Sequence, residues 1–298
     1  MYDVIIIGCG PAGMTSAIYA ARANKKVLIL EKESIGGQMS SAPLIENYPG
    51  YQSISGSELA SNMFDQMMNL NVDFELEEVK DIINGDTKKV VTDSNTYEGK
   101  TIIIATGSKY RLLGLENEVN LIGNGIHFCT SCDGIFFKDK TVAIIGGGNS
   151  AVINSLTMAD ICKKVYVIQN LDDLTAESIL VDKLKLKENV EIITNTNVNK
   201  IIGETSLESI VISVNGQEQE IKLDGMFISI GLIPQSELVS NILKINKYGY
   251  IESNNCVTEI PGIFVAGDCR DKMFRQVTIS VGDGTTAATE AINYLNNK

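Results

Sequence analysis

Two cysteines and an aspartate stand close together in the sequence, where Cys129, Cys132 and Asp133 form the motif C-x-x-C-D. Two thiols at this spacing can close a small disulfide ring, and thiol–disulfide exchange needs a thiolate, a leaving thiol and a nearby proton source. Asp133 is suited to be that source. Half of a zinc site, or two inert buried thiols, would give the same spacing, but no second cysteine pair or histidine cluster is present to complete four zinc ligands. The motif therefore favours a working dithiol.

The other four cysteines have no partner at a motif spacing. They are Cys9, Cys162, Cys256 and Cys269. We expect them to act as small apolar residues, and one spaced pair among six cysteines is typical of a protein from a reducing compartment. His127, the only histidine, precedes Cys129 by two residues. It could tune a thiolate, but a lone histidine beside a motif is more often a packed or solvated residue.

The first element pattern that could position such chemistry covers residues 3–32. An apolar strand is followed by a glycine turn, a helix with small residues on its face, and a second strand. Gly8, Gly10 and Gly13 fit G-x-G-x-x-G, and Glu31 follows Gly13 by 18 residues. The glycines allow a tight turn, close approach of a pyrophosphate and close helix packing, while Glu31 can accept hydrogen bonds from a ribose. An accidental glycine-rich turn would not explain the strand, helix and acid together.

The same pattern recurs at residues 140–169, with Gly146, Gly148 and Ala151 in the fingerprint positions. Each copy is followed by an apolar strand that ends in glycine, at Gly107 and at Gly231. The chain is therefore predicted to be an α/β protein with two nucleotide-binding-type units. Counting 18 residues from Ala151 leads to Gln169, so the second copy lacks the ribose acid of the first.

Composition bounds the remaining possibilities. The chain has 298 residues, of which 44% are hydrophobic and 21% charged, as in ordinary globular proteins of one or two domains. No apolar run approaches the ~20 residues that span a bilayer, and no signal-peptide pattern is visible, so we expect a cytoplasmic protein. The net charge of −12 disfavours nucleic acid or an anionic membrane surface as a partner.

A further apolar strand near the carboxyl end closes at Gly267 and Asp268, and Arg275, Gln276 and Val277 open a helical segment. A carboxylate at the end of a strand can hold a hydroxyl of a bound ligand, and N–H groups at the start of a helix favour negative charge on a ligand. The alternative is a strand capped by aspartate with an arginine on the surface.

Several segments together resemble one family, the low-molecular-weight thioredoxin reductases. They are "GCGPAGMTSAIYAARA", "GGQ" at 36–38, "ENYPG" at 46–50, "IIATG", "CTSCDG" at 129–134, "GGGNSA", "GIFVAGD" at 262–268 and "RQV" at 275–277. The resemblance implies two Rossmann-like three-layer domains, with an FAD-binding domain at 1–113 plus 241–298 and a dithiol domain inserted at 114–240. It also implies a homodimer that reduces thioredoxin.

The resemblance assigns roles to individual residues. Cys132 would face the flavin, Cys129 would exchange with the disulfide of thioredoxin, and Asp133 would be the general acid. Asn47 and Thr106 are similar to flavin-contacting positions, although from the residues alone they could equally be turn residues. The residues expected to bind FAD are Gly8, Gly10, Gly13, Glu31, Gly37, Gln38, Asn47, Thr106, Gly107, Gly267, Asp268, Arg275, Gln276 and Val277.

The usual members of the family bind NADPH through a second-domain signature H-R-R-x-x-x-R, whose arginines grip the 2′-phosphate. This chain has Gln169, Asn170, Leu171 and Thr175 at those positions, so every cationic anchor is missing. Gln169 does not make an NAD site either, because that site needs an acid there. The chain thus resembles most the ferredoxin-dependent flavin thioredoxin reductases, which implies ferredoxin as electron donor. NAD(P)H bound in an altered pose, another flavoprotein donor, or a flavin-bound redox sensor remain alternatives.

Overall fold

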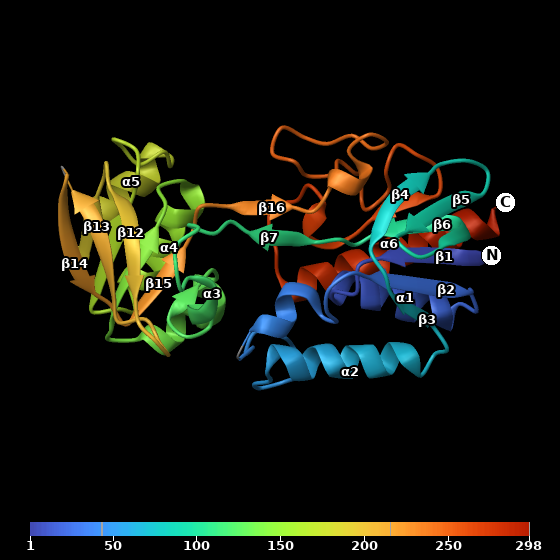
Figure 1. Ribbon diagram of the computed structural model, residues 1–298, viewed down its shortest axis with the longest axis horizontal. Coiled ribbons are helices and arrows are strands. Elements are labelled where there is room, and N and C mark those ends of the chain that lie inside the picture. Colours follow the sequence, from blue (N-terminus) through green and yellow to red (C-terminus); the bar gives the residue numbers. More distant parts are fainter. Residues whose placement is uncertain (43, 215, 298) are drawn as a thin grey trace. The chain divides into compact units, whose positions relative to one another are not determined.

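The computed structural model describes residues 1–42, 44–214 and 216–297 (Figure 1). Its chain forms two compact units, one made of Met1–Lys109 with Ile233–Lys298 and the other of Tyr110–Leu232. The sequence analysis placed the changes of unit after residues 113 and 240. Strands β7 (Ser108–Tyr110) and β16 (Leu232–Pro234) carry the chain between the units and pair with each other. No helix in the described part of the chain is both long and apolar enough to cross a membrane.

The first unit is built around a mainly parallel sheet. Strand β1 (Tyr2–Ile7) lies between β2 (Val27–Glu31) and β6 (Thr96–Ile104), and β3 (Asp73–Leu76) extends the sheet beyond β2. On the other side of β6, the antiparallel strand β5 (Lys88–Thr92) pairs with its first half, and the parallel strand β17 (Ile263–Val265) pairs with its last residues. Strand β4 (Val79–Ile83) pairs with β5 at the edge. The carboxyl ends of β1, β2, β6 and β17 therefore share one edge.

Alternating residues of β1 enter two different hydrophobic clusters. Val4 and Ile6 pack with helices α1 (Pro11–Arg22), α2 (Gly56–Met68) and α6 (Val277–Asn296), whereas Ile5 and Ile7 pack with apolar residues of 238–251. Because both faces of the sheet are covered, its central strands are continuous apolar runs rather than alternating ones. Helices α1 and α6 pack against each other, which brings the two ends of this unit's sequence together.

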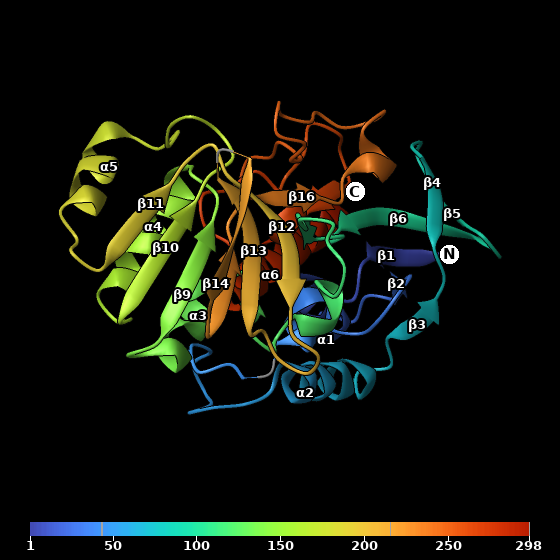
Figure 2. The ribbon, with the colours of Figure 1, turned by 60° about the vertical axis from the view of Figure 1, so that its left-hand side comes forward.

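The second unit contains a parallel sheet in the order β11 (Val190–Ile193), β10 (Lys164–Ile168), β9 (Thr141–Ile145), β15 (Gly225–Ile228) and β8 (Ile126–His127). Helices α4 (Asn149–Ala159) and α5 (Ser178–Lys185) cover one face, and their apolar residues pack on Val142 and Ile144. The antiparallel strands β12 (Asn197–Ile202), β13 (Ser209–Val214) and β14 (Gln217–Lys222) cover the other face (Figure 2). The predicted α/β fold with two Rossmann-like units is confirmed by the strand order and by the comparisons reported below.

The two glycine turns follow β1 and β9, as the sequence predicts. Gly8 has φ +108°, and a Cβ atom there would lie 2.3 Å from the carbonyl oxygen of Ala105. Gly146 has φ +125°, and a Cβ atom there would lie 2.6 Å from the carbonyl oxygen of Ser229. Both positions therefore exclude a side chain for two reasons, backbone conformation and the neighbouring strand.

Candidate functional site

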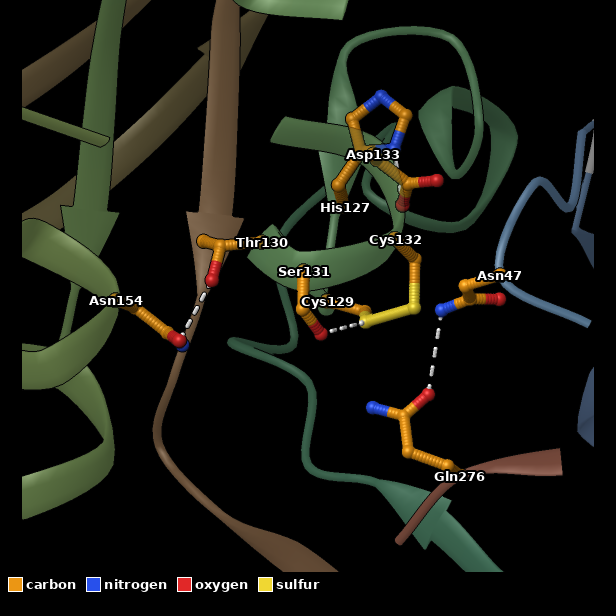
Figure 3. Close-up of a disulfide and its surroundings, with 9 residues drawn as sticks. All are labelled: Asn47, His127, Cys129, Thr130, Ser131, Cys132, Asp133, Asn154 and Gln276. Carbon is orange, nitrogen blue, oxygen red and sulfur yellow. Dashed lines mark hydrogen bonds and ion pairs between the residues drawn. A yellow bond between two sulfur atoms is a disulfide. The ribbon is translucent and has the colours of Figure 1, made fainter. Parts of the chain in front are cut away.

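Cys129 and Cys132 are joined by a disulfide, with their Cα atoms 5.3 Å apart (Figure 3). The short helix α3 (Thr130–Asp133) begins directly after Cys129, and the N–H of Asp133 donates to the carbonyl of Cys129 at 3.0 Å. This single turn places the two sulfur atoms within bonding distance of each other. Both cysteines are half-buried, and the Cys129 sulfur lies 3.3 Å from the hydroxyl of Ser131. The pair that the sequence singled out can therefore open and close within one helical turn.

The remaining cysteines are buried and carry free thiols. Burial, with a smaller effect from the charge of Glu31, raises the pKa of the Cys9 thiol to about 12. Burial also raises the pKa of Cys162 to about 11 and that of Cys256 to about 12. Because a thiol reacts as its thiolate, these residues are inert at neutral pH. They are packing residues, as expected from the sequence.

Helix α3 is hydrogen-bonded on two sides to other residues of the second unit. The hydroxyl of Thr130 donates to the Asn154 side chain at 2.6 Å (Figure 3). Asn154 in turn donates to the Ser229 hydroxyl at 3.0 Å. On another side, Nδ1 of His127 lies 3.0 Å from Oδ2 of Asp133, and both residues are buried. The sequence analysis gave His127 no partner. Its position at the end of the strand that leads into C-x-x-C was the available signal.

The first glycine turn borders a cavity of about 450 Å³, whose walls include Gly8, Glu31 and Thr106. A Cβ atom built on Gly10 would meet nothing within 4 Å, so this turn has open space before it. Gly37 lies beside Gly10, with its Cβ position 3.7 Å from the Gly10 Cα atom. This volume is in the range of small-molecule sites and is large enough for a nucleoside.

The carboxylate of Glu31 is held rigidly at the end of β2. Its Oε2 accepts from the N–H of Cys9 at 2.8 Å, and its Oε1 accepts from the N–H groups of Lys32 and Glu33 at 2.8 and 2.9 Å. These bonds link the acid to the glycine turn itself. A carboxylate has about four acceptor sites, so Glu31 retains capacity for a ribose hydroxyl of a ligand in the cavity.

The residues expected to bind FAD that lie outside the segment β1–α1–β2 also make contacts within the first compact unit. Gln38 donates through Nε2 to the backbone carbonyl of Ser108, and Thr106 donates to the carbonyl of Gln235 at 2.5 Å. Asn47 donates to the Gln276 side chain at 3.4 Å (Figure 3). Gly107 has φ +71°, as the turn after β6 requires, and Val277 is the first residue of α6.

A buried charge network surrounds Asp268. Lys272 bridges two carboxylates, with Nζ 3.1 Å from Oδ1 of Asp268 and 3.0 Å from Oδ2 of Asp283. Asp283 also accepts from Arg270 at 2.9 and 3.4 Å and from the N–H of Gly267 at 3.1 Å. Asp283, Arg270 and Lys272 did not stand out in the sequence, because their contacts join a loop to the second turn of α6.

Arg275 has a buried donor that the described residues of the first unit do not satisfy. Its guanidinium carbon lies 4.1 Å from the centre of the Tyr250 ring, yet its Nε is buried without a hydrogen-bond partner among the described residues. An orphaned buried donor is unusual and costs free energy unless a ligand satisfies it. Together with the cavity, the open turn at Gly10 and the fixed acid Glu31, this donor fits a bound FAD.

The second glycine turn is contacted by residues that follow strand β10. The side chain of Gln169 is 5% exposed and lies against Gly147, where an added Cβ atom would come within 2.6 Å of the Gln169 amide. The N–H of Thr175 donates to the carbonyl of Gly147 at 2.8 Å. Asn149 and Glu177 exchange two hydrogen bonds of 2.8 and 3.1 Å just beyond the turn. The segment 169–177 therefore contacts this turn and the first residue of helix α4.

Comparison with known proteins places these features in a context. A family model described as pyridine nucleotide-disulphide oxidoreductase matches residues 2–284. The chain is 40% identical to a thioredoxin reductase of Bacillus subtilis (strain 168), covering 99% of this chain and 95% of that protein. It is also 40% identical to the 34.2 kDa protein in the rubredoxin operon of Clostridium pasteurianum, covering 99% and 98%. The crystal structure of thioredoxin reductase from Streptococcus pyogenes MGAS5005 has a TM-score of 0.95 and 41% identity, covering 100% of this chain and 99% of that one.

Proposed function

Because the chain belongs to the pyridine nucleotide-disulphide oxidoreductase family, we propose that it is an FAD-dependent thioredoxin reductase whose electrons come from reduced ferredoxin rather than NADPH. Cys129–Cys132 is its redox-active disulfide. We also propose that it acts in the cytoplasm as a homodimer. The observation that carries the choice of donor is that the second unit has no cationic anchor at the four positions of the family signature.

The dithiol performs the exchange with thioredoxin. The Cys129 thiolate attacks one sulfur of the thioredoxin disulfide, that disulfide breaks, and a mixed disulfide forms. Cys132 then attacks the Cys129 sulfur, which restores the Cys129–Cys132 bond and releases thioredoxin with both sulfurs reduced. Two electrons pass from the dithiol to thioredoxin, whose two thiolates are then protonated. Asp133, the residue after Cys132, is the group that gives and takes a proton at the dithiol.

FAD would be held by residues of the first unit. The glycine turn at Gly8 and Gly10 would face its pyrophosphate, Glu31 would accept from its ribose, and Asp268 would accept from its ribityl chain. The buried Nε of Arg275 would gain a partner. FAD, when bound, supplies the chemistry that converts single electrons from an iron–sulfur protein into a pair for the disulfide.

The second unit argues against NADPH as donor. Three arginines of the family signature are replaced by Asn170, Leu171 and Thr175. A charge-assisted hydrogen bond contributes about 1.5–3 kcal/mol, so their loss weakens binding of a 2′-phosphate by orders of magnitude.

Ferredoxin is an adequate donor on energetic grounds. Iron–sulfur proteins at roughly −400 mV can reduce thioredoxin at about −270 mV, and two electrons over this difference release about 6 kcal/mol. The two other readings are the use of NAD(P)H in an altered pose or another flavoprotein as donor, and a flavin-bound redox sensor. A sensor would not turn over thioredoxin continuously, which separates it from both reductases.

The test is stopped-flow reduction of the bound flavin by equal concentrations of NADPH, NADH or reduced ferredoxin. We expect ferredoxin to bleach the flavin and drive thioredoxin reduction, whereas millimolar NADPH and NADH leave it oxidised. Rapid reduction by NADPH would refute the proposal. As a matched variant, Gln169→His with Asn170→Arg, Leu171→Arg and Thr175→Arg restores the family signature and should gain measurable NADPH binding. The three arginines without Gln169→His should gain less, because they restore only part of the family signature.

A further inference from the structure

His127 and Asp133 form a buried pair beside the disulfide (Figure 3). The Nδ1 to Oδ2 distance is 3.0 Å, and the two side chains are 7% and 13% exposed. His127 ends strand β8, whose residues pair with Met226 and Phe227, while Asp133 ends the helical turn that holds both cysteines. The pair therefore connects a rigid strand of the sheet to the turn on which the dithiol opens and closes.

Two aromatic rings pack near the buried imidazole of His127. The rings of Phe137 and Phe227 lie 5.1 and 5.5 Å from it, centre to centre. Of the charged and titratable groups on the surrounding elements, Asp133 contacts the imidazole. Lys140 lies 5.4 Å from the Phe137 ring, and the thiol of Cys162 donates to the Phe137 carbonyl at 3.1 Å. Within the described residues, Asp133 is thus the polar group that the structure gives His127.

A histidine and an aspartate in an apolar pocket are costly to bury singly, and a hydrogen bond between them offsets part of that cost. The pair can gain or lose one proton while the hydrogen bond between the two side chains keeps each of them partnered. A structural tie between β8 and α3 would need only a hydrogen bond between neutral groups. An ionisable couple placed one residue from Cys132 is instead suited to exchange a proton with the sulfurs.

We propose that His127 is a positioning residue of the redox centre, which orients Asp133 and shares with it the proton that the dithiol gains and loses. The inference rests on the role proposed above for Asp133. When two electrons enter the disulfide, its S–S bond breaks and leaves two thiolates; the protonated couple gives one proton to a sulfur and becomes neutral imidazole beside carboxylate. When the dithiol passes its electrons to a disulfide of thioredoxin, its own S–S bond re-forms, the sulfur that carried the proton returns it to the couple, and the two thioredoxin thiolates take their protons from water.

The first test uses the fact that His127 is the only histidine. Untagged holoprotein labelled with ¹⁵N-histidine gives one imidazole signal set, whose nitrogen shifts report the tautomer and the protonation state across pH. We expect the Nδ1–H tautomer in the neutral form. Reducing Cys129–Cys132 with dithiothreitol should shift the pH dependence of the imidazole signals, because the couple exchanges its proton with the sulfurs only in the reduced protein. The shift should be lost in Asp133→Asn. No shift, or the same shift in Asp133→Asn, would overturn the couple.

The second test measures transfer from the dithiothreitol-reduced protein, freed of reductant, to oxidised thioredoxin as a function of pH. His127→Phe, which fills the pocket without a donor, should slow the transfer about 10²-fold at neutral pH. His127→Asn, whose side-chain amide can donate from nearly the same place, should recover about tenfold of this loss but with a flattened pH profile. A wild-type profile in His127→Phe would overturn the inference.

Thr130→Val is the matched control, since it removes a side-chain hydrogen bond of the same helix without touching the couple. We expect it to keep the wild-type pH profile. Because dithiothreitol supplies the electrons, the result does not depend on ferredoxin as donor. Asp133→Asn transferring at the wild-type rate would remove the acid role proposed for Asp133. A slow Asp133→Asn with an unchanged His127 titration would remove only the present inference.

Discussion

Replacing Asp283 by alanine should destabilise the first unit more than any surface charge substitution. Asp283 is 7% exposed and accepts from Arg270, from Lys272 and from the backbone of Gly267. The side chains of Lys272 and Arg270 are 6% and 17% exposed, so both cations stay buried when the carboxylate is removed. Removing one partner of a buried pair costs about 3–5 kcal/mol. Lys272 keeps Asp268, which places the loss toward the lower end of that range.

Urea unfolding of the holoprotein, followed by the fluorescence of released flavin, measures this change in the first unit. Asp283→Asn should cost less than Asp283→Ala, because an amide oxygen can still accept from Gly267. The control is Glu98→Gln, which removes an exposed ion pair of the same unit, to Lys89, whose side chains are 49% and 47% exposed, and it should cost at most about 1 kcal/mol. A loss below about 1 kcal/mol in Asp283→Ala would contradict the view that this network is a buried charge centre.

Three further outcomes are expected. Cys132→Ser should still allow the donor to reduce the flavin but abolish thioredoxin reduction, and Cys129→Ser should stop turnover as well; wild-type turnover in either variant, measured with thioredoxin, would exclude this dithiol as the relay. Glu31→Ala should weaken FAD binding by about 1.5–3 kcal/mol, which gel filtration would show as loss of flavin from the protein. Full retention of the flavin would contradict the role proposed for Glu31 at the ribose. Because burial raises the pKa of Cys9 and Cys256 to about 12, these thiols stay protonated in the folded chain while they ionise when unfolded, so their contribution to the free energy of unfolding should be constant below about pH 9 and fall above it. Cys9→Ala should make that alkaline fall shallower in denaturation curves, by up to about 1.4 kcal/mol per pH unit.

Local spacing was enough to predict the parts of this protein that are encoded within a few residues. A glycine turn after an apolar strand requires glycine at Gly8 and Gly146 whatever the rest of the chain does, and both have the positive φ that this turn demands. Likewise, C-x-x-C on one helical turn brings Cys129 and Cys132 within bonding distance without help from distant residues. The repeat of strand, turn, helix and strand then predicted both α/β units, because the same short-range pattern occurs twice.

Contacts between segments far apart in the chain were decided by the tertiary structure. The hydrogen bonds of Asp283 form because helix α6 packs beside the loop that follows β17. The contact between Gln169 and Gly147 likewise depends on how the end of β10 lies beside the second glycine turn. His127 and Asp133 are six residues apart, but they face each other only because β8 is fixed in the sheet by β15 while α3 turns back toward it. Sequence determined which residues carry the redox chemistry; the packing of strands and helices decided which buried groups control their charge, because burial and partner geometry exist only in the folded chain.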